Sequence, residues 1–286
     1  MDQRIINLYD EYTHKPLSRH EFLRRLAMLA GGTAAAMAIL PMIEVNQAYA
    51  AITPDDDLFI ERITYPGING DMQAYVARPD KDKDKKYSAV VVMHENRGLN
   101  AHIEDVARRA AKAGYLAIAP NALSPLGGTP ANEDEARAKF QELKAEDNLQ
   151  NFIRVFDYLG GRKDCNGKYG CVGFCWGGAM ANNLAINVPN LRAAVAFYGR
   201  QPKLEDVPKI KAALQFHYGG LDEGVNKGIP AYEEALKKAN VKYEQYIYEG
   251  VNHAFHNDTA PTRYNEAAAK LAWKRTMDFF DKHIDD

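Results

Sequence analysis

Cysteine and tryptophan are scarce in this chain, and neither sign of charge predominates. The 286 residues include three cysteines and two tryptophans, and 36 Lys and Arg stand against 38 Asp and Glu, for a formal net charge of −2. Without a basic excess, neither nucleic acid nor an anionic membrane surface is expected as the main partner. The chain has no Cys-x-x-Cys pair, no internal repeat and no low-complexity tract. These absences argue against a thioredoxin-like redox protein, a solenoid and a disordered chain.

The composition is that of a protein able to bury a full core. Hydrophobic residues make up 46% of the chain and charged residues 26%, which is typical of globular domains. A chain of this length can hold one large domain or two small ones. We predict one catalytic domain over residues 51–286, preceded by an extension over residues 1–50.

The first 50 residues show the order of features that export signals have. Arg24-Arg25 precedes an uncharged stretch over residues 26–43, and Ala48-Tyr49-Ala50 follows as a small-residue cleavage motif. The preceding residues are similar to a twin-arginine signal, with His20 where the second arginine stands. We predict export to the periplasm. The alternative is a cytoplasmic protein that keeps this segment as a helix, and only through that segment would the chain reach a membrane.

Beyond residue 58, short apolar runs alternate with helical patterns. Residues 60–65 and 72–77 alternate apolar and polar side chains around a glycine-containing turn, which predicts an antiparallel hairpin. Residues 89–93 form a continuous β-branched run, typical of a strand buried on both faces of a parallel sheet. Further strands are expected over residues 115–119, 169–174, 193–198, 212–218 and 243–248, and helices over 103–113, 133–159 with a break near 147, 177–187, 230–239 and 264–283.

This alternation predicts an α/β fold. Its sheet is expected to be mainly parallel, with helices on both faces and an antiparallel hairpin at the N-terminal side. In such folds ligands bind beyond the carboxyl ends of the strands. Catalytic and binding residues are therefore expected at the junctions where a strand leads into a helix.

The segment Gly173-Phe174-Cys175-Trp176-Gly177 lies at such a junction. It has the nucleophile-elbow pattern of the α/β-hydrolase fold, with cysteine in the place of serine. A sharp turn exposes the nucleophile there, and the flanking glycines avoid clashes. The positive end of the following helix favours a thiolate. Cys175 is the predicted nucleophile; the alternative is a buried structural cysteine in a glycine-rich turn.

A thiol nucleophile needs a base, and the base needs a group that orients it. Asp222 follows the strand over residues 212–218, and His253 follows the strand over residues 243–248. The order nucleophile, acid, histidine is the one that this fold requires. We predict Asp222 as the orienting acid and His253 as the base, with Glu223 and His256 as their nearest rivals.

The loop after residues 89–93 carries a cluster of polar groups, His94-Glu95-Asn96-Arg97. In this fold that loop supplies one N–H of the oxyanion hole, and the residue after the nucleophile supplies the other. The candidates are the backbone N–H groups of Asn96 and Trp176. Arg97, Tyr198 and Phe255 lie at or near strand ends and are candidate substrate contacts, and Arg200 is a second cation that could meet a carboxylate.

Four ordered motifs together resemble the dienelactone hydrolase (carboxymethylenebutenolidase) family: the elbow at Cys175, Glu95 after its strand, the Gly-Gly-Leu-Asp turn ending at Asp222, and Asn-His-Ala-Phe around His253. The resemblance runs from about residue 60 to the C-terminus. It implies a Cys-His-Asp triad on an α/β-hydrolase fold, with Glu95 holding the resting thiol and taking its proton as substrate binds. The family's characterised enzymes have an arginine just after the catalytic histidine, and residues 254–257 contain none.

We therefore expect a hydrolase of small esters or lactones that uses no cofactor or metal. A general carboxylesterase or thioesterase and a catalytically silent binding protein of the same fold are alternatives. A thiol-handling protein and a metal site of His253, His256 and a cysteine are weaker ones. Cys165 and Cys171 either pair in a disulfide or remain unreactive thiols. Nothing in the sequence predicts the oligomeric state.

Overall fold

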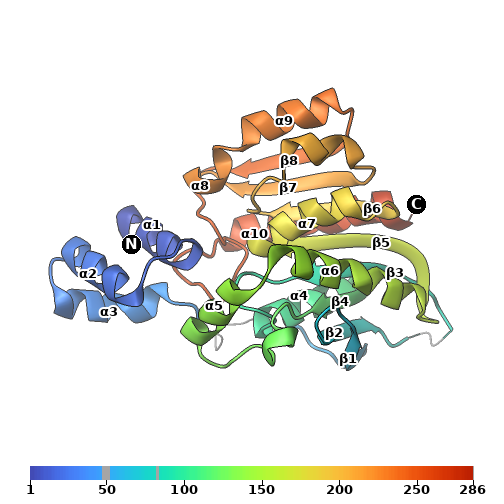
Figure 1. Cartoon of the computed structure of the whole chain (residues 1–286), viewed down its shortest axis with the longest axis horizontal. Helices are drawn as coiled ribbons and strands as arrows, with labels where there is room; N and C mark the ends of the chain where they lie inside the picture. The colour runs from blue at the N-terminus through green and yellow to red at the C-terminus, as the bar shows by residue number, and fades with distance from the viewer. Residues whose placement is uncertain (47–51, 82–83, 286) are drawn as a thin grey trace.

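The computed structural model describes residues 1–46, 52–81 and 84–285, and shows an eight-stranded sheet with helices on both faces (Figure 1). The strand order is β1-β2-β4-β3-β5-β6-β7-β8. β1 and β2 pair antiparallel, β2 pairs antiparallel with β4, and the remaining neighbours are parallel. The bounds are β1 Leu58–Pro66, β2 Asp71–Pro79, β3 Tyr87–Met93, β4 Leu116–Pro120, β5 Cys165–Phe174, β6 Leu191–Phe197, β7 Ala213–Gly219 and β8 Tyr243–Tyr248. This is the predicted α/β-hydrolase architecture.

Two helical layers cover the sheet. Buried residues of α4 and α10 share a core with one face, and those of α6, α7 and α9 share a core with the other. The bounds are α4 Ala101–Lys112, α5 Glu133–Glu142, α6 Ala145–Gly160, α7 Trp176–Asn187, α8 Glu223–Asn226, α9 Ile229–Lys238 and α10 Glu266–Phe280, with shorter turns η2 Ser124–Leu126, η3 Leu204–Lys209 and η4 Asp281–Asp285. Every residue of β3 is buried, as its continuous apolar run predicts for a central parallel strand.

The break in one predicted helix lies elsewhere than expected. The helix expected over residues 133–159 does break, but at Leu143 and Lys144, whose backbones are extended, and not near Asp147. Asp147 lies in the first turn of α6, where a carboxylate is favoured by the helix dipole. The polar residues Asp147 and Asn148, which suggested a break, therefore belong to the start of the second helix.

The three cysteines are free and buried, so the Cys165–Cys171 disulfide does not form in the structure. Both residues belong to β5, in which they are six positions apart. A strand rises by about 3.3 Å per residue, so six positions separate two residues far beyond the reach of a disulfide.

The N-terminal extension folds as three helices, α1 Gln3–His14, α2 Arg19–Ala30 and α3 Thr33–Ile43. They enclose a small apolar core of their own that includes Tyr12, Phe22 and Leu40. Among the described residues, no single helix meets the length and hydropathy needed to cross a membrane; α2 and α3 meet it only jointly, and they are bent by 110°. The Ala48-Tyr49-Ala50 motif lies outside the described residues, and export stays a prediction.

Candidate active site

Cys175 occupies a sharp turn between β5 and α7. Its backbone has φ 55° and ψ −109°, a strained conformation for a residue with a side chain. A Cβ at Gly173 would overlap the carbonyl group of Gly177, and a Cβ at Gly177 would overlap the carbonyl of Met93. The two glycines therefore allow the chain to turn tightly enough to present the cysteine at the end of the sheet.

His253 and Asp222 form a buried pair beside this turn. His253 Nδ1 lies 2.5 Å from Asp222 Oδ2, and the other carboxylate oxygen accepts from the backbone N–H of Val225 at 3.1 Å. Asp222 follows β7 and caps α8, so the start of that helix fixes its carboxylate. Burial alone would lower the pKa of His253, but the Asp222 carboxylate and the Cys175 sulfur outweigh burial and raise it well above its ordinary value. Burial opposes ionisation of Asp222 as well, yet His253 keeps the pKa of that carboxyl below its usual range.

Cys175, Asp222 and His253 meet although they are distant along the chain. The Cys175 sulfur and a ring nitrogen of His253 lie within 4.8 Å of each other. The ring nitrogen of His253 that faces away from Asp222, Nε2, has no hydrogen-bond partner among the described residues. An imidazole held by a carboxylate on one side and open towards a thiol on the other is arranged to exchange a proton with that thiol.

His256, the rival base, has a different environment. It is buried and stacks on Phe174 with ring centroids 4.9 Å apart. Burial and the neighbouring His102 hold the pKa of His256 well below its ordinary value. Glu223, the rival acid, lines the cavity but takes no part in the pair with His253.

Glu95 lies near Cys175, and its carboxylate is hydrogen-bonded to side chains other than the thiol. Its carboxylate accepts from the Tyr198 hydroxyl at 3.2 Å and from Asn257 Nδ2 at 2.9 Å. Burial and the Glu95 carboxylate raise the pKa of Tyr198 well above its usual value. Glu95 and Cys175 line one small space, but no hydrogen bond joins them in the described part of the chain. The family resemblance implies that Glu95 contacts the resting thiol directly. In the structure its carboxylate is bonded to Tyr198 and Asn257 instead.

The two predicted oxyanion donors lie close to Cys175. Trp176 is the first residue of α7, its ring stacks on His94 at 5.4 Å, and both Trp176 and Asn96 line the cavity with Cys175. The Asn96 side chain donates to the carbonyl of Thr13 at 2.7 Å. The loop that carries Asn96 is thereby tied to α1.

The predicted substrate contacts divide into two groups. Tyr198 lines the main cavity. Arg97 is buried and pairs with Glu133 at 3.2 Å, and Phe255 is fully buried against Tyr198; neither lines the main cavity. Arg200 is an exposed cation that does line it.

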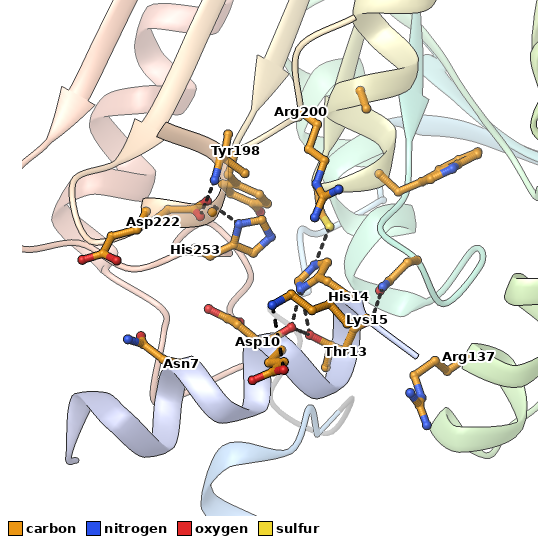
Figure 2. A pocket seen from close by; sticks show the side chains of 18 of the residues that line it. Asn7, Asp10, Thr13, His14, Lys15, Arg137, Tyr198, Arg200, Asp222 and His253 are labelled. Carbon is orange, nitrogen blue, oxygen red and sulfur yellow. Dashed lines mark hydrogen bonds and ion pairs between the residues drawn. The ribbon is translucent and has the colours of Figure 1, made fainter. Parts of the chain in front are cut away.

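The main cavity has a volume of about 580 Å³ and is lined by Asp222 and His253, which Figure 2 labels, and by Cys175. One of its walls is α1, which contributes Asn7, Asp10, Glu11, Thr13 and His14, with Lys15 directly after it. His14 Nε2 lies 3.0 Å from the Cys175 sulfur, and the His14 ring meets the His253 ring edge-on at 4.7 Å. Burial and the nearby His253 hold the pKa of His14 well below its ordinary value. Sequence analysis missed this residue because the first 50 residues resemble a segment that is removed.

Comparison with known proteins identifies the family. Residues 72–284 match the model of the dienelactone hydrolase family. The chain belongs to this family. A "Putative carboxymethylenebutenolidase" of Escherichia coli O157:H7 is 32% identical over 246 residues, which cover 81% of this chain and 90% of that protein. A protein of the same printed name from Methylorubrum extorquens is 29% identical over 286 residues, covering 94% of this chain and 96% of its own length.

Solved structures agree with this assignment. The crystal structure of a "Putative Dienelactone Hydrolase" from Klebsiella pneumoniae has a TM-score of 0.71 and 28% identity, and the match covers 79% of this chain and 99% of that one. The protein is therefore a dienelactone-hydrolase-like hydrolase that acts on ester bonds. The family match begins at residue 72, so α1, α2 and α3 lie outside it.

Proposed function

We propose that this member of the dienelactone hydrolase family cleaves small esters or lactones, with Cys175 as nucleophile, His253 as base and Asp222 orienting that base. The observation that carries the proposal is the meeting of a thiol, an imidazole and a carboxylate at the carboxyl ends of three strands. His253 Nδ1 is 2.5 Å from Asp222, and the other side of the ring faces the sulfur. Such a constellation is defined by geometry and not by sequence position.

The reaction starts with a proton transfer from the Cys175 thiol to His253. The thiolate then attacks the carbonyl carbon, a carbon–sulfur bond forms, and the carbonyl oxygen becomes an oxyanion that backbone N–H groups of Asn96 and Trp176 stabilise. His253 returns its proton to the leaving oxygen, which leaves a thioester on Cys175. Water attacks the thioester while His253 takes a proton, and the carboxylic acid and the thiol are released.

The cavity supports a small substrate of mixed polarity. Lys15, Arg137 and Arg200 line it together with Asp10, Glu11 and Glu223, so cations and carboxylates are both present. A uniformly basic wall, which an acidic lactone would favour, is not what surrounds the sulfur. Arg200 and Lys15 are exposed cations in this lining that a substrate carboxylate could meet. Short activated esters, lactones and thioesters are the substrates to test first.

Replacing Cys175 by Ala tests the cysteine mechanism. We expect kcat for short p-nitrophenyl esters to fall by about a thousandfold or more, since a nucleophile's loss leaves only binding and oxyanion stabilisation. Cys165→Ala is the matched control, because Cys165 is a buried thiol at the start of β5 that does not line the cavity. Equal hydrolysis by the wild type and Cys175→Ala would remove the mechanism, and no hydrolysis by the wild type with any activated ester would favour a binding protein.

Export through the N-terminal segment is a separate proposal that rests on the sequence. Fractionation of cells that express the full chain, followed by mass measurement of the intact protein, tests it. A periplasmic protein shortened to residue 51 supports cleavage after Ala50, and a full-length cytoplasmic protein contradicts it.

A further inference from the structure

Three metal-binding side chains converge above the nucleophile. A ring nitrogen of His14, the sulfur of Cys175 and a ring nitrogen of His253 all lie within 4.8 Å of one another. Figure 2 shows His14 pointing from α1 towards His253, which lies on the loop after β8. We propose that these three residues form a zinc site that caps the Cys175 sulfur and switches the proposed hydrolysis off.

Hydrogen bonds fix which nitrogen each ring presents to the sulfur. His14 Nδ1 lies 2.8 Å from the carbonyl oxygen of Asp10, which can only accept, so Nδ1 carries the proton. The Nε2 lone pair of His14 is then directed to the sulfur, 3.0 Å away. His253 uses Nδ1 to contact Asp222, and its buried Nε2 has no hydrogen-bond partner among the described residues. Once His253 has given up any proton on Nε2, both imidazoles offer a lone pair towards the same point.

The hydrogen-bond partners of the two histidines, on the ring nitrogens that face away from the sulfur, are of the kinds found in zinc sites. Metal-binding histidines usually donate their other N–H to a carboxylate or a backbone carbonyl, which fixes the ring and makes the metal-binding nitrogen more basic. Asp222 is such a carboxylate for His253, and the Asp10 carbonyl serves His14 in the same way. Neither partner has to move for metal to bind.

The donor set and its spacing suit zinc. Cysteine thiolates and histidine nitrogens are both usual zinc ligands, open zinc sites have three protein ligands, and tetrahedral bonding places such donors about 3.3–3.6 Å apart. Binding would lengthen the present 3.0 Å between His14 and Cys175 a little and draw His253 inward. The cavity of about 580 Å³ that all three residues line leaves room for water at the fourth position. The Cys175 thiolate and the Asp222 carboxylate together balance the two positive charges of the ion.

Zinc binding would stop the proposed reaction because the ion replaces the proton on the Cys175 sulfur. The thiol proton and any proton on His253 Nε2 are released to solvent, water leaves the hydrated ion, one sulfur–zinc and two nitrogen–zinc bonds form, and no electron is transferred. The sulfur lone pair that would attack a carbonyl is then engaged with the metal, and His253 can no longer accept the thiol proton. This inhibitory consequence depends on the proposed function, whereas the metal site itself does not.

Titration of the full-length, metal-free protein with Co²⁺ tests the site directly. We expect one equivalent to bind and to produce a sulfur-to-cobalt charge-transfer band, which Zn²⁺ then removes by displacement. His14→Ala should weaken binding by about a hundredfold or more, because losing even an outer partner of a metal ligand costs about 10–100-fold. Cys175→Ser should abolish the charge-transfer band. His20→Ala, which removes an exposed histidine from the same segment, is the matched control and should bind like the wild type.

The outcomes separate the metal site from the catalytic proposal. Absence of the charge-transfer band, or equal cobalt affinity in the wild type and in both His14→Ala and His14→Gln, overturns the site; the second variant keeps a polar side chain in case Ala disturbs α1. Parallel assays then measure ester hydrolysis with and without Zn²⁺. Cobalt binding without any esterase activity would leave the site standing and remove the proposed function. Esterase activity that depends on Cys175 but is insensitive to Zn²⁺ would overturn the inhibitory role.

Discussion

The catalytic domain and the N-terminal helices are held together by different kinds of contact. The domain packs the buried apolar faces of its helices on both sides of its sheet, and the residues of the proposed triad follow strand ends. The helices α1, α2 and α3 have a separate apolar core and meet the domain largely through polar groups. Among these contacts, Arg263 pairs with Asp10 at 2.8 Å, and Asn252 accepts from Gln3 at 2.6 Å. The proposed triad is thus held by the sheet itself, whereas His14 is placed on the sulfur by an interface that can be weakened separately.

Asp222→Asn should have the largest effect, a loss of kcat, and should leave the docking of α1 unchanged. An amide cannot hold His253 in the tautomer that accepts the thiol proton, so we expect kcat for an activated ester to fall by about 10⁴-fold. Asn keeps the acceptor that caps α8, so folding should persist. Glu223→Gln removes the adjacent carboxylate and is the control, with kcat expected to change by less than about threefold. A similar loss in both variants would mean that general charge, and not the Asp222–His253 pair, matters.

Asp10→Asn should loosen the segment and leave the triad intact. Arg263 is buried and would lose its charged partner, at a cost of about 1–3 kcal/mol to docking of α1. That corresponds to roughly a 5- to 150-fold shift of the docking equilibrium. Hydrogen exchange of the α1 amides should speed up, while the amides of β3 and β5 stay protected. Glu21→Gln, which alters ion pairs within α2 only, should leave α1 exchange unchanged.

Acidification should also release α1, with a smaller effect. Burial and His253 hold the pKa of docked His14 well below 6.5, and in the undocked segment the imidazole regains its ordinary value. The undocked state therefore binds more protons below pH 6.5, so docking is strongest above that pH and weakens as the pH falls. One pH unit below 6.5 the shift should be roughly tenfold. Exchange of α1 amides measured across this range should rise in the wild type and stay flat in His14→Gln, and a flat wild-type profile would contradict the docked, neutral histidine.

His14→Ala should have the smallest effect, on the reactivity of the thiol. A neutral imidazole that accepts from the thiol stabilises its protonated form and covers the sulfur. Without it, alkylation of Cys175 by iodoacetamide at neutral pH should be roughly three- to tenfold faster, which is the value of one net hydrogen bond. His20→Ala serves as the reference. Slower alkylation would instead make His14 the base that generates the thiolate.

The sequence predicted the parts of the site that follow strands. The elbow at Cys175, the acid after β7 and the histidine after β8 each depend on a local pattern at a known place in the fold, so their convergence could be anticipated. The eight-stranded sheet followed from the alternation of buried runs and amphipathic helices. Strand and helix ends are displaced by a few residues, as at the start of β5 and at Leu143 and Lys144.

The role of α1 could not be predicted in this way. His14 reaches Cys175 across 161 positions through a polar interface, and no periodic pattern encodes such a contact. The same residues also match an export signal, and that prediction carries a consequence for the site. Cleavage after Ala50 would remove His14, and with it one wall of the cavity and the zinc ligand that we propose. The carboxylate of Glu95 was likewise expected on the thiol, but Tyr198 and Asn257 hold it instead.

Trapping the acyl-enzyme tests the central claim most directly. The full-length protein is mixed with p-nitrophenyl acetate, quenched in acid within the first turnover, and mapped by peptide mass. The triad predicts one acetyl group per chain, on the peptide that contains Cys175, and none on the same peptide from Asp222→Asn at equal times. Steady hydrolysis with an unmodified Cys175, or acetylation of another residue at the rate of turnover, would contradict it.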